Sequence, residues 1–179
     1  VKANADKAFE TAGLSANDYM EQVTSFSASL LSSLGGDTAK SADVANTAMV
    51  DMADNANKFG TDMGSIQNAY QGFAKQNYTM LDNLKLGYGG TKEEMQRLLN
   101  DAQQLTGVKY NIDNLSDVYN AIHAIQENLG VAGTTADEAS KTFSGSFAMM
   151  KASVTNLLGN LSIGDGEAVA RSMGQLVDS

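Results

Sequence analysis

Apolar residues recur along the chain at steps of three and four positions, the spacing that places side chains on one face of an α-helix. The stripes are Tyr19, Val23, Phe26, Leu30 and Leu34; Ala42, Ala45, Met49, Met52, Ala56 and Phe59; Met63, Ile66, Tyr70 and Phe73; Met95, Leu98, Leu99, Ala102 and Leu105; Leu115, Val118, Tyr119, Ile122, Ile125 and Leu129; and Phe143, Phe147, Met150, Val154, Leu157 and Leu161. Only residues 108–112 alternate, and that stretch is too short and isolated to form a sheet. The pattern therefore predicts an all-α protein, a multi-helix bundle of about seven amphipathic helices with no significant sheet.

Glycines and capping residues mark where the predicted helices begin and end. Ser15, Asp37 and Thr91 stand at N-cap positions, and either Asp113 or Ser116 opens the helix that follows residue 112. Residues 134–138 offer overlapping capping boxes, and Met80, Leu81, Leu84 and Leu86 indicate a short helix or turn.

These boundaries divide the chain into three expected parts. Residues 1–13 are expected to be the end of an upstream helix, residues 14–163 a compact helical core domain, and residues 164–179 the start of the next module or a linker. The last boundary is placed at Gly164, Asp165 and Gly166. Because both ends of the chain read as parts of helices, we expect it to be a piece of a larger protein.

Composition favours close helix packing. The chain has no proline, which is permissive for long helices, and Ala and Met supply much of its apolar content. The stripe from Ala42 to Phe59 has heptad spacing, but it is short enough that a helical hairpin or bundle explains it as well as a coiled coil does. Met49, Met52, Met149 and Met150 are interpreted as core residues, with a promiscuous binding groove as the alternative.

Charge and cysteine content exclude several function classes. The net charge is -9, with only 12 Lys and Arg residues and no run of them, so we expect no non-specific nucleic-acid binding. The chain has no cysteine, which excludes disulfides, a thiolate nucleophile and Cys-ligated metals. No apolar run of about twenty residues is present, so we expect no membrane span in this segment.

Residues with catalytic chemistry are few, and none is nominated as a site. His123 is the single histidine; Asp117 and Glu127 are its nearest partners in sequence, and we interpret it as structural or solvated. The pairs Asp51 with Asp54 and Glu93 with Glu94 are interpreted as solvated faces. We therefore expect no catalytic, cofactor-binding or metal-binding residues, no cofactor and no enzymatic activity.

The Gly-rich run Gly87-Tyr88-Gly89-Gly90-Thr91-Lys92 is a candidate phosphate-binding loop. A P-loop needs a Lys followed by Ser or Thr after a buried strand, whereas here Thr91 precedes Lys92 and the upstream residues look helical. We interpret the run as a turn that leads into a capping box formed by Thr91 and Glu94. Asn77, Asn114 and Asn160 open Asn-x-Ser/Thr triplets, which we interpret as accidental.

Five blocks of this sequence resemble the conserved core of tail tape measure proteins of long-tailed bacteriophages and related prophages. They are residues 51–63 (DMADNANKFGTDM), 65–77 (SIQNAYQGFAKQN), 78–99 (YTMLDNLKLGYGGTKEEMQRLL), 121–130 (AIHAIQENLG) and 133–146 (GTTADEASKTFSGS). Their order and spacing extend the resemblance over roughly residues 8–163.

The resemblance implies a very long, mostly helical protein inside the tail tube that sets tube length, takes part in assembly and leaves ahead of the DNA at ejection. It implies contacts with the tail tube protein, tail assembly chaperones and tail-tip proteins, and leaves open self-association of the full-length protein. The implied location is the virion, with the host cytoplasm during assembly. The alternatives are a helical adaptor or chaperone-like binding module and, third, part of a phage-associated cell-wall hydrolase.

Overall fold

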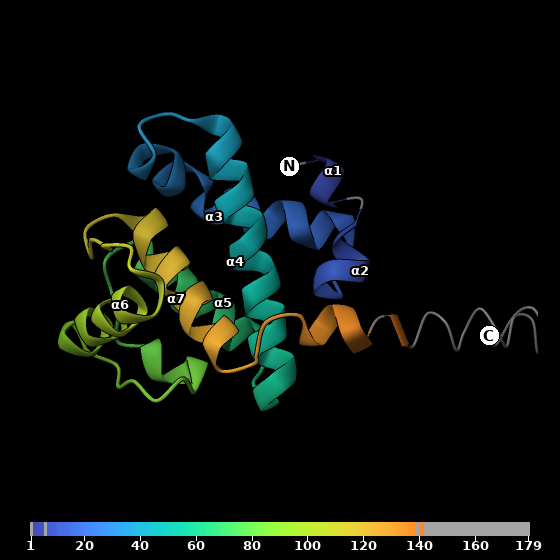
Figure 1. Cartoon of the computed structure of the whole chain (residues 1–179). Coiled ribbons are helices and arrows are strands. Elements are labelled where there is room, and N and C mark those ends of the chain that lie inside the picture. Colours follow the sequence, from blue (N-terminus) through green and yellow to red (C-terminus); the bar gives the residue numbers. More distant parts are fainter. Residues whose placement is uncertain (1, 6, 139, 142–179) are drawn as a thin grey trace, which may run out of the picture. The chain divides into compact units, whose positions relative to one another are not determined.

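A computed structural model confirms the all-α prediction: it contains no strand in the part of the chain that it describes, which is residues 2–5, 7–138, 140 and 141 (Figure 1). In chain order the elements are α1 (Lys2–Ala5), α2 (Ala8–Ala12), α3 (Ala16–Ser33), α4 (Thr38–Phe59), α5 (Met63–Phe73), the 3₁₀ helix η1 (Leu81–Leu84), α6 (Lys92–Thr106) and α7 (Leu115–Asn128). Residues 134–138, with 140 and 141, are also helical. The helix expected over residues 143–161 lies outside the described residues.

The chain divides into two compact units, residues 1–136 and residues 137–179. Ala5 and Ala8, from the first two short helices, belong to the same apolar core as α3 to α7. Helices α1 and α2 therefore contribute to the packing of the first unit through Ala5 and Ala8. The boundary expected at residues 164–166 lies outside the described part of the chain.

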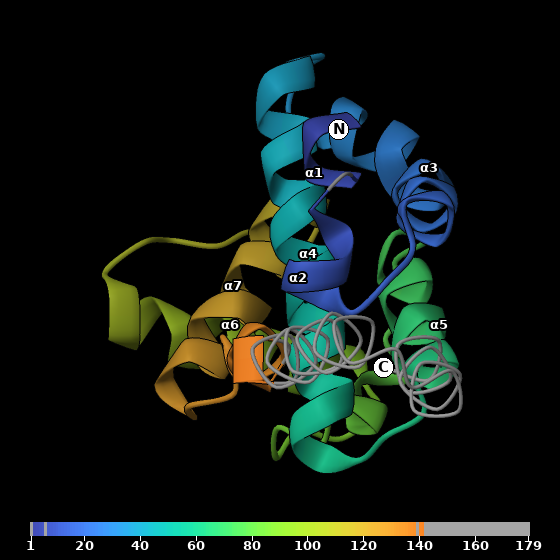
Figure 2. The same ribbon diagram turned by 90° about the vertical axis from the view of Figure 1, so that its right-hand side faces the viewer.

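Helix α4 is the central helix of the first unit, and it packs against α2, α3, α5 and α7 (Figures 1 and 2). Met49 and Met52 are 0% and 1% exposed, which confirms that these two methionines are core residues. Ala45 is also buried, whereas Ala42 and Phe59 at the two ends of the predicted stripe are only partly buried. Met149 and Met150 lie beyond the described residues.

An aromatic cluster joins α3, α5 and α7. Tyr119 of α7 lies 5.0 Å from Tyr70 of α5 and 5.8 Å from Phe26 of α3, measured between ring centroids. The Phe26 and Tyr119 rings meet edge to face, one of the favoured arrangements for aromatic pairs. The Tyr119 hydroxyl donates a 2.8 Å hydrogen bond to the backbone carbonyl of Tyr70, so its burial leaves no unpaired donor.

Most of the predicted helix starts are confirmed. Ser15, Asp37 and Thr91 each accept a hydrogen bond from a backbone amide in the first turn of α3, α4 and α6. The prediction for the start of α7 was wrong: the cap is Asn114, and not Asp113 or Ser116. Its side chain accepts from the Asp117 amide at 3.1 Å and also donates to the Ser33 carbonyl at 2.9 Å, a contact 81 positions away that only the fold reveals.

Two of the predicted inward positions are wrong. Leu105 and Leu129, the last residues of their apolar stripes, are 50% and 48% exposed. Leu105 lies in the last turn of α6 and Leu129 caps the end of α7. Both residues follow the helical spacing of their stripes, but they lie at helix ends where neighbouring helices no longer cover them.

No helix among the described residues is long and apolar enough to cross a bilayer.

Candidate functional site

One turn of α4 carries a cluster of buried polar side chains. Asp51, Asp54 and Asn55 are 1%, 0% and 0% exposed. The interpretation of Asp51 and Asp54 as a solvated face is therefore wrong. The physical reason is that α4 has helices on several sides, so residues that face away from its apolar stripe are covered as well. Buried carboxylates and amides require partners, and each of the three finds one far away in the sequence.

Asp51 pairs with His123 of α7. Its Oδ1 lies 2.8 Å from His123 Nδ1, although 72 positions separate the two residues. The hydrogen bond to Asp51 raises the pKa of His123, against the opposing effect of its partial burial. Burial raises the pKa of Asp51, and the contact with His123 opposes that rise. The pair thus fixes the ring of a partly exposed histidine from its buried side.

The sequence neighbours proposed for His123 have different roles. Glu127 does lie one turn away, with Oε1 3.4 Å from His123 Nε2. Asp117 instead accepts a 2.9 Å hydrogen bond from the Asn111 amide and orders the loop before α7. The partner that matters most, Asp51, could not be found from spacing within one helix.

Asn55 and Gln126 make a second bridge between α4 and α7. The Asn55 amide nitrogen donates to Gln126 Oε1 at 2.7 Å and to the Leu84 carbonyl at 2.9 Å. The Gln126 amide in turn donates to the Asp51 carbonyl at 3.3 Å. These contacts hold η1, α4 and α7 in a fixed arrangement, because each amide has one geometry that satisfies its partners.

Asp54 holds the beginning of the next helix. Its Oδ2 accepts a 2.6 Å hydrogen bond from the Gly133 amide, and its Oδ1 accepts a 2.8 Å bond from the Thr135 amide. Free amides and the helix dipole make a helix N-terminus a favourable place for a carboxylate. The capping box predicted within residues 134–138 is therefore replaced at this end by a cap from α4, and the Thr134 hydroxyl donates to the Val131 and Asp54 carbonyls.

We call these residues the α4 staple: Asp51, Asp54 and Asn55 together with their partners His123, Gln126, Gly133 and Thr135. The staple binds the C-terminal half of α4 to α7 and to the start of the helix after Gly133. The sequence contained a weak signal for it, namely three polar residues placed beside Met52 and Ala53, which lie at the buried part of α4. That signal did not reveal which residues were the partners.

Hydrogen bonds that involve Thr91, Glu94 and Arg97 order the Gly-rich turn at residues 87–90, and part of this arrangement was predicted. The Glu94 amide donates to Thr91 Oγ1 at 3.2 Å, which confirms half of the capping box. The other half differs, because the Glu94 carboxylate accepts from the Gly89 amide at 2.9 Å and not from the amide of Thr91. Arg97 donates to Glu94 at 2.6 Å and to the Gly87 carbonyl at 2.9 Å. The Gly87 carbonyl and the Gly89 amide of the turn are thus both hydrogen-bonded to side chains of α6.

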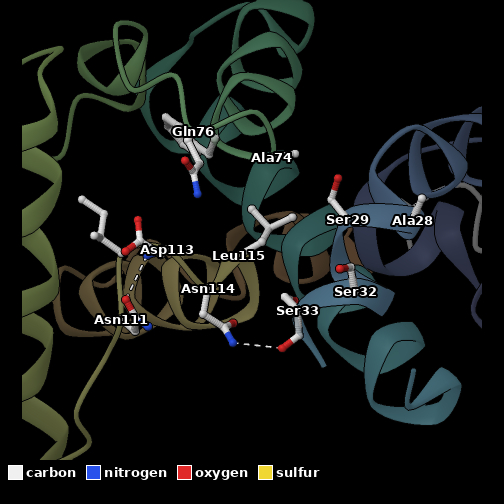
Figure 3. A pocket seen from close by; sticks show the side chains of 12 residues that line it. Ala28, Ser29, Ser32, Ser33, Ala74, Gln76, Asn111, Asp113, Asn114 and Leu115 are labelled. Atoms are coloured by element: carbon white, nitrogen blue, oxygen red, sulfur yellow. Dashed lines mark hydrogen bonds between the residues drawn. The ribbon is translucent and has the colours of Figure 1, made fainter. Parts of the chain in front are cut away.

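An open groove lies between the end of α3, the end of α5 and the residues before α7 (Figure 3). Its volume is about 640 Å³. Ser29, Ser32, Gln76 and Asp113 are among its lining residues, and Asn114 joins two of its walls by the hydrogen bond to Ser33. The groove is mixed in character, with hydroxyl, amide and apolar groups side by side.

The described residues include no group of three or more His, Asp or Glu side chains placed to hold a metal ion. Comparison with known proteins adds no identity: no protein-family model, no curated protein and no solved structure matches the chain.

Proposed function

We propose that this chain is a structural segment of a phage tail tape measure protein, acting in tail-tube length determination and assembly and in DNA ejection. The observation that carries the proposal is the set of five sequence blocks in the family's order and spacing. Its partners would be the tail tube protein, the assembly chaperones and the tail-tip proteins, and its location the inside of the tail tube.

The positions of those blocks support a structural role. The block over residues 51–63 supplies Asp51, Asp54 and Asn55 to the α4 staple. The block over residues 121–130 supplies His123 and Gln126, and the block over residues 133–146 supplies the amides that Asp54 binds. Three blocks that lie far apart in the sequence thus meet in one set of hydrogen bonds, as expected where the family-like residues maintain a fold.

The groove between α3, α5 and residues 111–115 is the observation that favours the second candidate, a helical adaptor or chaperone-like binding module. The two candidates predict different sequences on either side of this segment. A tape measure protein requires long helical sequence flanking this segment, and an adaptor does not. Sequencing the gene on both sides of the segment therefore separates them.

The experiment that tests the proposal is disruption of the core in the phage or prophage that encodes this chain. Leu98 and Leu99 of α6 are 0% and 1% exposed, so replacing both with Asp buries unpaired charge and unfolds the segment. We expect few or no normal tails in electron micrographs, without a graded series of shorter ones.

The matched control places the same charges on the exposed face of the same helix. Gln96 and Asn100 are exposed, so Gln96→Asp with Asn100→Asp should leave tails normal in number and length. Normal tails in the Leu98→Asp, Leu99→Asp phage would show that the segment is dispensable, and the proposal would then fail.

A further inference from the structure

His123 and Glu127 present two metal-binding atoms to solvent at a suitable separation. His123 Nε2 lies 3.4 Å from Glu127 Oε1, one helical turn further along α7. The two side chains are 33% and 63% exposed, so neither is closed off from solvent. A tetrahedral Zn²⁺ ion holds nitrogen and oxygen ligands at about 2.0–2.2 Å, which places two ligand atoms about 3.4 Å apart. The observed separation is therefore close to that of two ligands of one ion.

The other face of the His123 ring has the support that metal-binding histidines usually have. Asp51 Oδ1 lies 2.8 Å from His123 Nδ1, and the Asp51 side chain is 1% exposed. A carboxylate on one ring nitrogen fixes the tautomer in which the other nitrogen has a free lone pair. Here that second nitrogen is Nε2, the atom beside Glu127. Among the described residues Asp51 Oδ2 has no hydrogen-bond partner, so the bond to His123 is the one hydrogen bond that this buried carboxyl makes.

We propose that His123 and Glu127 form a binding site for a divalent transition metal ion of the Zn²⁺ type, with Asp51 as the residue that positions the imidazole. Imidazole with one carboxylate suits Zn²⁺, Cu²⁺ and Ni²⁺, whereas Mg²⁺ and Ca²⁺ prefer sites made of oxygen atoms. Two protein ligands leave the remaining positions to water. The binding is accordingly weaker than in a structural zinc site, which has four protein ligands.

The test is a titration of the full chain with ZnCl₂, followed by the ¹⁵N resonances of the His123 ring. We expect Zn²⁺ to shift Nε2 strongly at submillimolar concentrations, and Mg²⁺ at the same concentration to leave it unchanged. Glu127→Gln keeps the size of an exposed side chain and should weaken binding at least tenfold. Glu21→Gln, an exposed acid-to-amide change on α3, is the matched control and should leave the affinity unchanged.

The role of Asp51 is tested separately. Asp51→Asn should weaken Zn²⁺ binding about 10–100-fold, the range seen when the residue behind a metal-binding histidine is lost. The proposal is overturned if millimolar Zn²⁺ leaves the His123 Nε2 resonance in place, or if Glu127→Gln binds as tightly as the unchanged chain. An Asp51→Asn variant with unaltered affinity and a folded NMR spectrum would overturn the positioning role.

Discussion

Asp54 and Gly133 are separated by 79 positions in the sequence, yet Asp54 Oδ2 accepts a 2.6 Å hydrogen bond from the Gly133 amide. The second oxygen of the same carboxylate accepts from the Thr135 amide at 2.8 Å. A buried side chain of α4 thus fixes the path of the chain as it leaves α7.

Replacing Asp54 with Asn should destabilise the protein. An amide has one acceptor oxygen, so one of the two backbone amides would face an NH₂ group and lose its hydrogen bond. We expect the free energy of unfolding to fall by about 1–3 kcal/mol, the cost of leaving a buried polar group unpaired. Urea denaturation measures that change, and amide hydrogen exchange at Gly133 and Thr135 should become faster.

The matched control is Asp43→Asn, the same change at an exposed position of α4. A surface substitution of this kind should alter stability by less than about 0.5 kcal/mol. Equal effects of the two substitutions would mean that the Asp54 contacts do not hold the segment after Gly133.

Gly90 should tolerate no side chain. A Cβ atom at this position would lie 2.2 Å from the Thr79 carbonyl oxygen, which is a backbone atom that cannot rotate away. Gly90→Ala should therefore cost about 3 kcal/mol or more, at the upper end of overpacking effects. At Gly89 the nearest atom would be Glu94 Cγ at 3.5 Å, an ordinary contact, so Gly89→Ala is the control with a small effect. Thermal melts of the two variants compare them directly, and similar melting temperatures would contradict this account of the turn.

Replacing Gln76 with glycine should stabilise the protein. Its backbone has φ 57°, in the left-handed region that costs a non-glycine residue about 1–2 kcal/mol. The Asn77 amide donates to the Gly72 carbonyl at 2.9 Å, so Gln76 occupies the place after α5 where helices commonly end with glycine. We expect Gln76→Gly to raise the free energy of unfolding by about 0.5–1 kcal/mol. Gln103→Gly, inside α6, should instead lower it by about 1 kcal/mol.

Glu94 should remain ionised at pH values between about 2 and 4.5, where an ordinary glutamate becomes protonated. The hydrogen bonds from Arg97 and then from the Gly89 amide lower the pKa of its carboxyl from 4.5 to about 2. A lowered pKa means that the contact contributes stability above pH 4.5, and that this contribution is lost as the pH falls through about 2. A ¹³C NMR titration of the Glu94 carboxyl measures the pKa. Arg97→Met should raise the pKa of Glu94 toward 4.5. Lys92→Met removes a positive charge from the same helix and is the control; it should leave the pKa of Glu94 low.

The helices were predictable from the sequence because their signals are local. The apolar stripe of Tyr19, Val23, Phe26 and Leu30 needs only the helical repeat, and all four residues are buried. The caps Asp37 and Thr91 act on amides three positions further along, so they too can be recognised within a short window.

The staple was not predictable because its signals are not local. Asp51 looks like a surface residue in any window of sequence, since its partner His123 is 72 positions away. Asn114 is a mixed case: its cap bond to the Asp117 amide is local and was missed, whereas its second bond, to the Ser33 carbonyl of α3, is visible only in the fold. The predictions for Leu105 and Leu129 were wrong for a different reason. The apolar spacing continues to the ends of these helices, where the neighbouring helices no longer cover the side chains.

We propose that this segment belongs to a protein whose length sets the length of a phage tail. An α-helix rises about 1.5 Å per residue, so the length of a helical ruler follows from its residue count.

The most direct measurement is tail length in electron micrographs after an in-frame deletion in a helical stretch flanking residues 14–163, with the segment itself left intact. We expect uniformly shorter tails, by about 1.5 Å for each residue removed if that stretch is straight. Tails of unchanged length after such a deletion would contradict the proposed role in length determination.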